Sequence, residues 1–486
     1  MSSAIEGLKP ELVWKYFAEI AKIPRCSGKE AAVSKYVVDT ARKLGLDARA
    51  DAVANVIVRK PASPGHEKAR SVVLQGHLDM VCEKNKDTVH DFSKDPIRIV
   101  RKGDFLMADG TTLGADNGIA VATCLAIMED KTIEHGPLEF LFTVDEETGL
   151  NGAKNVDGGT LVSRTLLNLD SEEEGELYVG CSGGADTVAI WEAAFEPAPA
   201  HSIAGLLKVG GLRGGHSGLE IDKGRGNAIK IINRALERLA ALGARLSSID
   251  GGNKRNAIPR ETEAVLFVPD KNWDQAVASV DELKSTVKRE LGRVEPDFGM
   301  ELTALKAGKK GRVLKKSLQR KISQTITALP HGVIKMSADI PGLVETSTNL
   351  AVIKTGRKSI TIATSQRSPV ASEINDICRT VHTVFELGGA DKIDCGDGYP
   401  GWKPNMDSEI LKFMKSTYQS LYGEEPLVKA VHAGLECGII GERCPGMDMI
   451  SFGPSMSGVH SPDEKLDIES VGKFWNYLLA VLKNMK

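Results

Sequence analysis

Three apolar segments of this chain end in histidine or acidic residues, and no other feature constrains its fold as much. Each segment is short and rich in Val, Leu or Phe, as a buried strand is, and polar residues follow it closely. The segments and the polar residues after them are 72–74 with His77 and Asp79, 138–144 with Asp145, Glu146 and Glu147, and 165–169 with Asp170. Because ligands of an open α/β sheet bind at the carboxyl ends of its strands, we expect these side chains to meet at one sheet edge.

His77 and Asp79 stand two residues apart, so on extended backbone both side chains point to the same side. A neutral imidazole can bind a metal through one nitrogen while a carboxylate holds its other N–H. His77-Leu-Asp79 supplies both partners. Taken alone, the pattern is weak and a surface turn is the commoner interpretation, so the other strand ends must supply the missing ligands.

Two glycine-rich segments add further candidates. Asp116 is expected at or just before the amino end of an apolar helix over 119–130, where capping the helix is the alternative role. His460 stands in a glycine- and serine-rich loop after an expected strand at 448–452. Both residues therefore join the set of potential metal ligands.

The combined set mixes imidazoles and carboxylates. Such a mixture suits zinc, cobalt or manganese better than calcium, which prefers oxygen alone, or copper(I), which prefers sulfur. Five ligands are too many for one open catalytic zinc, but they suit two ions that share a bridging carboxylate and one water. The candidate ligands are His77, Asp116, Glu147, Asp170 and His460.

Length and charge define the class of protein. With 486 residues the chain is too long for one hydrophobic core, so two or three domains are expected. Its 62 basic and 65 acidic residues give a net charge of −3, which offers no case for a nucleic acid or an anionic membrane as partner. Because the amino end lacks the pattern of a signal peptide and no apolar run could span a bilayer, we expect a cytoplasmic protein.

The eight cysteines are scattered and form no Cys-x-x-Cys pair. This spacing argues against a structural zinc cluster and against a disulfide framework. We expect buried, reduced thiols.

The order of expected elements indicates an interrupted α/β domain. Strands and helices alternate up to a flexible joint expected at 180–184, and the same texture returns after a second joint at 396–401. Between the joints lie strands of looser pattern and amphipathic helices. The expected domains are a catalytic domain in two parts, 1–186 and 398–486, and an inserted domain, 187–397.

Together these segments resemble the dinuclear-zinc aminopeptidase, aminoacylase and carnosinase family. The resemblance covers essentially the whole chain and rests on His77-Leu-Asp79, the Asp116 loop, Asp145-Glu-Glu147, Asp170 and the late His460. It implies an α/β, mixed-sheet, three-layer catalytic domain like that of the zinc exopeptidases, with an inserted α+β lid. It also implies two divalent ions per subunit, zinc in the first place and cobalt or manganese otherwise. A homodimer through the lid domain is expected.

The resemblance assigns roles in the catalytic domain. His77 and Asp170 would hold one ion, and Glu147 and His460 the other. Asp116 would bridge the two ions, Asp79 would orient His77, and Glu146 would be the general base. Glu436 would face the substrate's amino group, although a buried carboxylate at a helix start is the alternative.

The resemblance also assigns roles in the lid. Gly215-His-Ser-Gly218 would bring His216 to the substrate carbonyl, from the same subunit or across the dimer. Asn256 and Arg367 match substrate-binding positions, and a guanidinium suits the carboxylate of a free dipeptide. Without the resemblance, His216 would be a turn residue and Arg367 a solvated surface charge. The segment 269–354 exceeds the lid of smaller relatives, and its basic cluster at 309–316 is expected to be a solvated loop rather than a site for an anionic partner.

The expected reaction is hydrolysis of unblocked dipeptides by a hydroxide that bridges the two ions, while the lid excludes water. A preference for carboxyl-terminal histidine, β-alanyl-histidine included, follows from the resemblance alone. A tripeptide aminopeptidase or an N-acyl-amino-acid amidase is the alternative on the same site. A metal-dependent peptide-binding protein is the alternative of another class, and Glu146 argues against it because a pure binder needs no base.

Overall fold

The computed structural model describes residues 3–305 and 311–485, and the chain forms two compact units. Unit 1 consists of Met1–Cys181, Trp402–Ala430 and Leu435–Lys486, and unit 2 of Ser182–Gly401 and Val431–Gly434. The expected domain limits at 187 and 397 lie inside unit 2. The chain passes from unit 1 to unit 2 between Cys181 and Ser182, inside the joint expected at 180–184, although strands β8 and β9 reach up to this point on either side.

A mixed eight-stranded sheet forms the centre of unit 1. Its strands in spatial order are β1 (Asp47–Ala50), β2 (Val56–Lys60), β6 (Leu138–Thr143), β3 (Val72–His77), β7 (Thr165–Asn168), β23 (Asp448–Ser451), β8 (Glu176–Cys181) and β22 (Leu427–Val431). The strands β6, β3, β7 and β23 run parallel to one another, whereas β1, β2 and β8 are antiparallel to their neighbours. Every residue of β3, β6 and β7 is buried, as is typical of parallel strands covered by helices.

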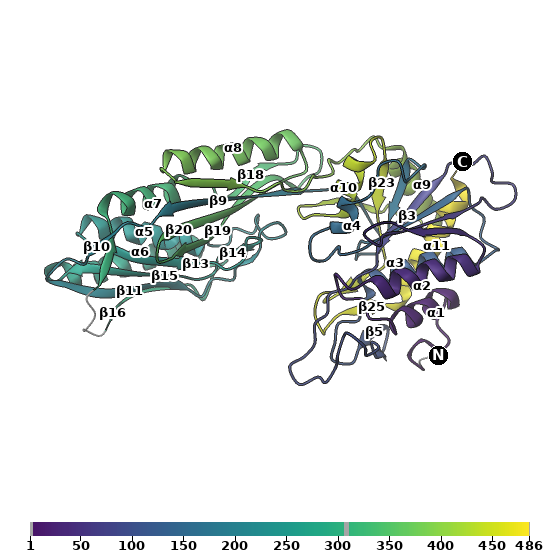
Figure 1. Ribbon diagram of the computed structural model, residues 1–486, viewed down its shortest axis with the longest axis horizontal. Helices are drawn as coiled ribbons and strands as arrows, with labels where there is room; N and C mark the ends of the chain where they lie inside the picture. The colour runs from purple at the N-terminus through teal and green to yellow at the C-terminus, as the bar shows by residue number, and fades with distance from the viewer. Residues whose placement is uncertain (1–2, 306–310, 486) are drawn as a thin grey trace. The chain divides into compact units, whose positions relative to one another are not determined.

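Helices cover this sheet. The helix α3 (Ala115–Glu129) packs on β3, and Figure 1 shows α1 (Glu11–Ile20) and α2 (Ala31–Lys43) on the same side of the strands as α3. The other helices of unit 1 are a 3-10 turn (Ser3–Ile5), α4 (Asn151–Lys154), α9 (Glu409–Tyr422), α10 (Glu436–Arg443) and α11 (Ile468–Asn484). The mixed α/β class predicted for this part of the chain is confirmed.

A smaller antiparallel sheet of unit 1 carries the segment around His460. Its strands in spatial order are β24 (Met456–Ser457), β25 (Lys465–Asp467), β5 (Phe105–Ala108) and β4 (Ile99–Lys102). The strands β24 and β25 form a hairpin with Met456 opposite Leu466, so residues 458–464 are its loop. The hairpin follows β23 after only four residues, so it lies near the carboxyl end of that strand in the main sheet.

Unit 2 is an α+β domain, with helices on one side of an antiparallel sheet (Figure 1). Its strands in spatial order are β16 (Gly299–Ala304), β11 (Ser202–Gly210), β15 (Thr262–Pro269), β13 (Arg245–Gly251), β19 (Val344–Thr355), β20 (Ser359–Ser368), β9 (Gly183–Glu192) and β21 (Lys392–Cys395), with β18 (Gly332–Met336) beside β19. The helices are α5 (Ala228–Ala241), a 3-10 turn (Asp270–Asn272), α6 (Trp273–Leu291), α7 (Lys316–Ala328) and α8 (Ala371–Leu387). Their apolar faces and the sheet enclose one core that includes Leu207, Ile232 and Phe385.

Two short strand pairs complete unit 2. They are β10 (Phe195–Pro197) with β17 (Arg312–Leu314), and β12 (Gly215–His216) with β14 (Ala257–Ile258). The solvated loop expected at 309–316 is therefore wrong for its second half, because β17 pairs with β10 and α7 begins at Lys316. Lys309 and Lys310 lie outside the described residues.

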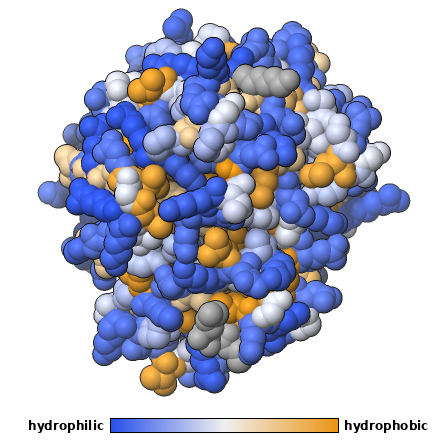
Figure 2. Space-filling model, turned by 90° about the vertical axis from the view of Figure 1, so that its right-hand side faces the viewer, coloured by the Kyte–Doolittle hydropathy of each residue, from blue (hydrophilic) through white to orange (hydrophobic). Residues whose placement is uncertain are grey.

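Within residues 3–305 and 311–485, no helix is long and apolar enough to cross a membrane. Charged and polar side chains dominate the face of the molecule in Figure 2, and small apolar groups lie between them. Scattered apolar groups of this size are normal on protein surfaces.

Candidate metal centre

The carboxyl ends of the parallel strands bring the predicted polar residues together. His77 is the last residue of β3 and pairs with Thr143, the last residue of β6. Glu146 and Glu147 follow the end of β6 after two residues, and one carboxylate oxygen of each lies within 4.8 Å of a ring nitrogen of His77. This is the arrangement that the strand-end pattern predicts.

Asp116 lies between the two histidines. Its Oδ1 atom is 3.1 Å from Nε2 of His77, and its Oδ2 atom is 3.2 Å from Nε2 of His460. Oδ1 of Asp170 is 3.3 Å from the same His77 nitrogen, and Oε2 of Glu147 is 3.0 Å from the same His460 nitrogen. The five residues thus form two groups of three that share the Asp116 carboxylate.

The start of α3 is irregular where it carries Asp116. Asp116 and Asn117 have non-helical backbone angles, so the regular helix begins after them, and the carboxylate faces the histidines instead of capping the helix. Oδ1 of Asn117 accepts from the His77 amide at 3.3 Å, and its Nδ2 donates to the Leu169 carbonyl at 2.9 Å. Asn117 therefore ties the start of the helix to the ends of β3 and β7.

Asp79 stands behind His77, with its Oδ1 atom 3.3 Å from Nδ1 of the ring. The same carboxylate accepts from the backbone N–H of Glu146 at 3.0 Å and of Glu147 at 3.2 Å. It also accepts from Oγ of Ser27 at 2.7 Å. Burial alone would raise the pKa of Asp79, but His77 and these donors hold it well below its usual range. An ionised Asp79 therefore orients both the histidine ring and the two glutamates.

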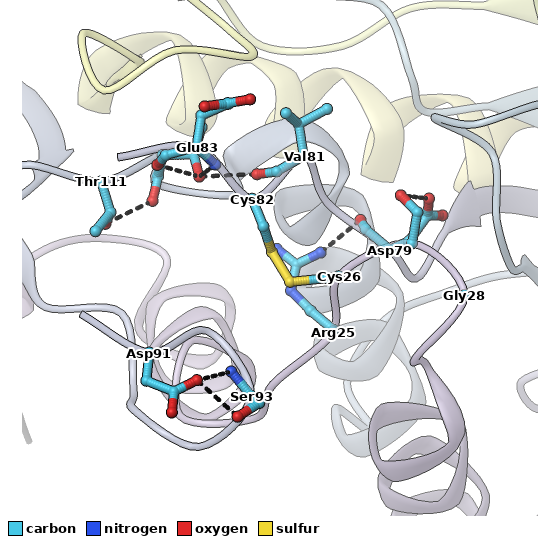
Figure 3. Close-up of a disulfide and its surroundings, with 12 residues drawn as sticks. Arg25, Cys26, Gly28, Asp79, Val81, Cys82, Glu83, Asp91, Ser93 and Thr111 are labelled. Atoms are coloured by element: carbon cyan, nitrogen blue, oxygen red, sulfur yellow. Dashed lines mark hydrogen bonds between the residues drawn. A yellow bond between two sulfur atoms is a disulfide. The ribbon is translucent and has the colours of Figure 1, made fainter. Parts of the chain in front are cut away.

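A disulfide fastens this region, so the expectation that all cysteines are reduced is wrong. Cys26 and Cys82 are joined, with 5.7 Å between their Cα atoms. Figure 3 shows the bridge beside Arg25, whose guanidinium donates to the carbonyls of Leu78 at 3.0 Å and Asp79 at 2.7 Å. The spacing of the cysteines gave no sign of this pair because 56 residues separate them. The other six cysteines are free, but only four of them are buried as expected, because Cys378 is half-buried and Cys395 is exposed.

The donor set fits a divalent cation. Oε1 of Glu147 is buried and has no hydrogen-bond partner within the described part of the chain. Burial raises the pKa of Glu146 well above its usual range, against the effect of His77 and with that of Asp170. Buried carboxylates in this number need positive charge to balance them, and imidazole with carboxylate suits zinc, cobalt or manganese.

Glu436 belongs to a buried polar network at the same strand ends. Its Oε2 atom accepts from Nε2 of Gln75 and from Oγ1 of Thr143, both at 2.6 Å. Gln75 in turn accepts from Asn168, and Asn168 accepts from Ser451. The chain of bonds crosses β3, β6, β7 and β23 and fixes the strand ends relative to one another. Glu436 is the first residue of α10, and burial raises its pKa to about 7.

His216, Asn256 and Arg367 form a group of their own in unit 2. Pairing of β12 with β14 places His216 opposite Ala257. Nδ1 of His216 accepts from the backbone N–H of Gly218 at 3.2 Å and of Leu219 at 3.1 Å. In a neutral ring the proton must then sit on Nε2, which makes that atom a donor. Burial, reinforced by Arg367, lowers the pKa of His216 to about 4, so the ring is neutral near pH 7.

The surroundings of this group are positively charged. Arg367 is only 7% exposed and donates to the Tyr399 hydroxyl at 3.1 Å, so it is not a solvated surface charge. Asn256 is exposed and lines, together with His216, a cavity of about 670 Å³. The charged residues that line this cavity are three cations, Arg213, Lys254 and Arg260, and one anion, Glu261. The cavity therefore offers a place for an anionic group.

Four residues that support the metal-ligand candidates were not predicted. Arg25, Ser27 and Glu464 stand in polar loops that carry no strand or helix pattern. Asn117 alone has a local signal, because it directly follows Asp116 in a glycine-rich segment that opens a helix.

Comparison with known proteins places the chain in a family. Residues 73–484 match the sequence model of Peptidase family M20/M25/M40. The chain belongs to this peptidase family. It is 41% identical to the cytosol non-specific dipeptidase of Escherichia coli (strain K12) over 484 residues, which cover 99% of each protein. The family resemblance drawn from the sequence is thereby confirmed.

Solved structures of the family agree with this fold. The aminoacylhistidine dipeptidase from Vibrio alginolyticus is 42% identical and superimposes with a TM-score of 0.91, over 100% of this chain and 98% of that one. An aminopeptidase from Bacillus cereus superimposes with a TM-score of 0.57 over 98% of each chain. At 16% identity this second structure shows only that the fold is shared.

Proposed function

We propose that this chain is a metal-dependent dipeptidase that acts on unblocked dipeptides. The observation that carries the proposal is the pair of histidine and carboxylate groups that share Asp116. Membership of a peptidase family supports it. The E. coli and V. alginolyticus relatives, which match over nearly their whole length, are both named as dipeptidases.

The proposed centre holds two divalent ions, zinc in the first place and cobalt or manganese otherwise. His77 and Asp170 would hold one ion, Glu147 and His460 the other, and Asp116 both. When bound, such ions polarise a peptide carbonyl and lower the pKa of water towards neutrality. The two Nε2 atoms that face Asp116 at 3.1 and 3.2 Å support this division.

Glu146 is the proposed general base. It would take the proton of the attacking water and return it to the leaving amine. Burial raises its pKa, which is the direction expected of a carboxylate that must accept a proton. Asp79 supports it by accepting the hydrogen bond of its backbone N–H.

His216 is the proposed donor to the oxyanion that forms from the peptide carbonyl. Its neutral state and its proton on Nε2 support this role, because a donor that is already in place needs no reorganisation. Asn256 and Arg367 are the proposed contacts of the substrate's carboxyl end. The excess of cations that line the cavity beside His216 supports the assignment of Asn256. The buried guanidinium of Arg367, which donates to the neighbouring Ser217, supports that of Arg367.

The finer proposal is a preference for carboxyl-terminal histidine, β-alanyl-histidine included. The two relatives differ on this point, since one is named non-specific and the other aminoacylhistidine dipeptidase. Glu436 is the proposed partner of the substrate's amino group, and its Oε1 atom, buried and without a partner within the described residues, supports this. A panel of dipeptides with and without carboxyl-terminal histidine, assayed after chelation with zinc, manganese or cobalt added back, tests the preference.

Replacement of Glu146 tests the mechanism. Glu146→Gln should lower kcat by about 10²- to 10⁴-fold, because the amide cannot accept the proton. Metal content, measured by mass spectrometry of the purified protein, should stay at the wild-type value. Asp145→Asn is the matched control, since the Asp145 side chain accepts from Thr148 and Asn151 within its own loop. Activity that survives in Glu146→Gln would refute the assigned base, and activity that no metal restores after chelation would refute the metal centre.

A homodimer through unit 2 and a cytoplasmic location complete the proposal. Exposed apolar residues on β18, which pairs with β19, support an interface there: Val333, Ile334 and Met336. Sedimentation of the purified protein tests the dimer. The name of the E. coli relative supports the cytoplasm, whereas the Cys26–Cys82 disulfide is unusual for a reducing compartment. Mass spectrometry of protein that is alkylated inside the cell decides between the two.

A further inference from the structure

The segment Leu113-Gly-Ala-Asp116 is held by one buried carboxylate from a distant part of the chain. Oε2 of Glu464 accepts from the backbone N–H of Leu113 at 2.7 Å and of Gly114 at 2.9 Å. Oε1 of Glu464 accepts from the backbone N–H of Ala115 at 2.7 Å and of Asp116 at 3.3 Å. Four consecutive amides thus point at the two oxygens of a side chain that is 2% exposed.

Glu464 stands at the end of the hairpin loop that carries His460. Lys465, the next residue, begins β25, which pairs with β24 on one side and with β5 on the other. Glu464 is therefore anchored by a sheet, while His460 lies further out in the loop, with a φ of 61°. Its carboxylate connects the loop of one proposed metal ligand to the backbone of another.

Arg25 holds the same segment from the other side. Its Nη2 atom donates to the carbonyl of Gly114, and its Nη1 atom donates to the carbonyls of Leu78 and Asp79. Gly114 has a φ of 69°, and a Cβ atom there would lie 2.5 Å from Nη2 of Arg25. Only glycine fits this close approach. The backbone before Asp116 is therefore hydrogen-bonded through its N–H groups to Glu464 and through one carbonyl to Arg25.

We propose that Glu464 is a positioning residue that sets where Asp116 stands between His77 and His460. Charge-assisted bonds to four amides fix the backbone from which the Asp116 side chain projects. That backbone position decides whether both Asp116 oxygens reach a histidine nitrogen, and hence whether one carboxylate can serve two ions. The inference rests on the proposed two-ion centre but adds a residue outside the ligand set.

Glu464→Gln is the discriminating variant. The amide keeps the size of the side chain but offers one acceptor oxygen and turns N–H donors towards backbone donors, so at most half of the four bonds can remain. Titration of the metal-free, full-length protein with cobalt(II), followed by visible absorption, counts the bound ions and gives the affinity for each. The second ion should bind at least about tenfold more weakly than in the wild type. The first should be less affected, because Asn117 still holds the start of α3 to β3 and β7.

Glu139→Gln is the matched control. Glu139 is also buried in unit 1 and accepts from two backbone amides, those of Val162 and Ser163, but it lies near the amino end of β6. Its replacement should lower the unfolding temperature and leave both cobalt affinities unchanged. If Glu464→Gln does not fold, Glu464→Asp, which keeps both oxygens on a shorter side chain, should show the same selective loss of the second ion.

The following outcomes decide whether Glu464 positions Asp116. Selective weakening of one ion in the Glu464 variant, absent from the Glu139 variant, supports the positioning role. Wild-type cobalt binding in Glu464→Gln, or an equal loss in both variants, overturns it and leaves Glu464 a structural residue. A wild-type protein that binds fewer than two cobalt ions overturns the two-ion centre itself, before any variant is considered.

Discussion

The histidines of the proposed metal centre in unit 1 and two histidines of unit 2, His216 and His432, have opposite surroundings. In unit 1, hydrogen bonds from Asp116 and then Glu147 raise the pKa of His460 to about 11 in the metal-free protein. In unit 2, burial and then Arg367 lower the pKa of His432 to about 3, and they lower that of His216 to about 4. The sign of the shift follows the charge of the neighbours.

We expect this difference in pKa to reflect the kind of ligand that each unit binds. His77 and His460 of unit 1 face more carboxylates than they can neutralise, so that group requires further positive charge, which divalent ions would supply. The histidines of unit 2 stay neutral beside a guanidinium, so they can act as N–H donors to a carbonyl or carboxylate oxygen. Unit 1 should therefore control metal content, and unit 2 should act on the substrate alone.

The largest expected effect concerns the disulfide of unit 1, since the described part of unit 2 contains none. The two cysteines of the Cys26–Cys82 bridge lie 56 residues apart. Removal of a cross-link that closes a loop of this length lowers the free energy of unfolding by about 4 kcal/mol, because the unfolded chain gains conformational entropy. The double variant Cys26→Ser with Cys82→Ser should lose that amount in unit 1. Chemical unfolding without reductant, followed by hydrogen exchange of peptides from β3 and β6, measures it.

Cys395→Ser is the control for this experiment. Cys395 is free and exposed in unit 2, and its replacement should change stability by less than about 0.5 kcal/mol. A wild-type protein that unfolds at the same denaturant concentration with and without reductant would show that the bridge contributes nothing to unit 1.

A smaller effect is expected from His216→Gln, which tests the separation of roles directly. Loss of one preorganised oxyanion donor costs about 10²- to 10³-fold in kcat, or about 3 kcal/mol. Metal content and cobalt affinities should stay at wild-type values, because His216 lies in unit 2. Steady-state kinetics beside metal analysis measures both. A His216 variant that loses metal would break the proposed division between the units.

The sequence predicted the candidate ligands because each carries a local signal. His77 ends an apolar strand, and Glu147 and Asp170 stand within four residues after one. Parallel strands must bring their carboxyl ends to one edge. Asp116 and His460 stand in glycine-rich segments next to a helix and a strand. Apolar patterning likewise placed four strands of unit 1, expected at 72–74, 138–144, 165–169 and 448–452, and the helix expected at 119–130 within a few residues of their observed bounds.

The supporting contacts could not be predicted because they join distant segments without any pattern. Glu464 reaches Leu113 across 351 positions, and Arg25 reaches Gly114 across 89. A glutamate in a polar loop is usually solvated, so nothing in Ser-Pro-Asp-Glu464 marks a buried carboxylate. The disulfide could not be predicted for the same reason. A β-bridge between Cys26 and Met80, two segments distant in the sequence, brings Cys26 close to Cys82.

The smallest expected effect is a pH dependence confined to unit 2. His432 is 6% exposed, and its folded pKa of about 3 lies below the roughly 6.5 of an unfolded histidine. Below pH 6.5 the unfolded state therefore binds a proton that the folded state does not, so stability falls as the pH falls and is constant above about pH 7. Between pH 6.5 and pH 5 the loss from this residue is about 2 kcal/mol.

His432→Gln isolates this contribution. The amide can keep a hydrogen bond to Oγ of Ser347, which lies 2.7 Å from Nε2 of His432, but it cannot take up the proton. Hydrogen exchange of peptides from β19 and β20 at pH 5 and pH 7 follows unit 2 separately, because the proposed metal centre of unit 1 would also release its ions in acid. The variant should keep part of the acid sensitivity, since burial lowers the pKa of His216 and of His331 to about 4. Equal stability of the wild-type unit at the two pH values would contradict the neutral histidines on which the comparison of the two units depends.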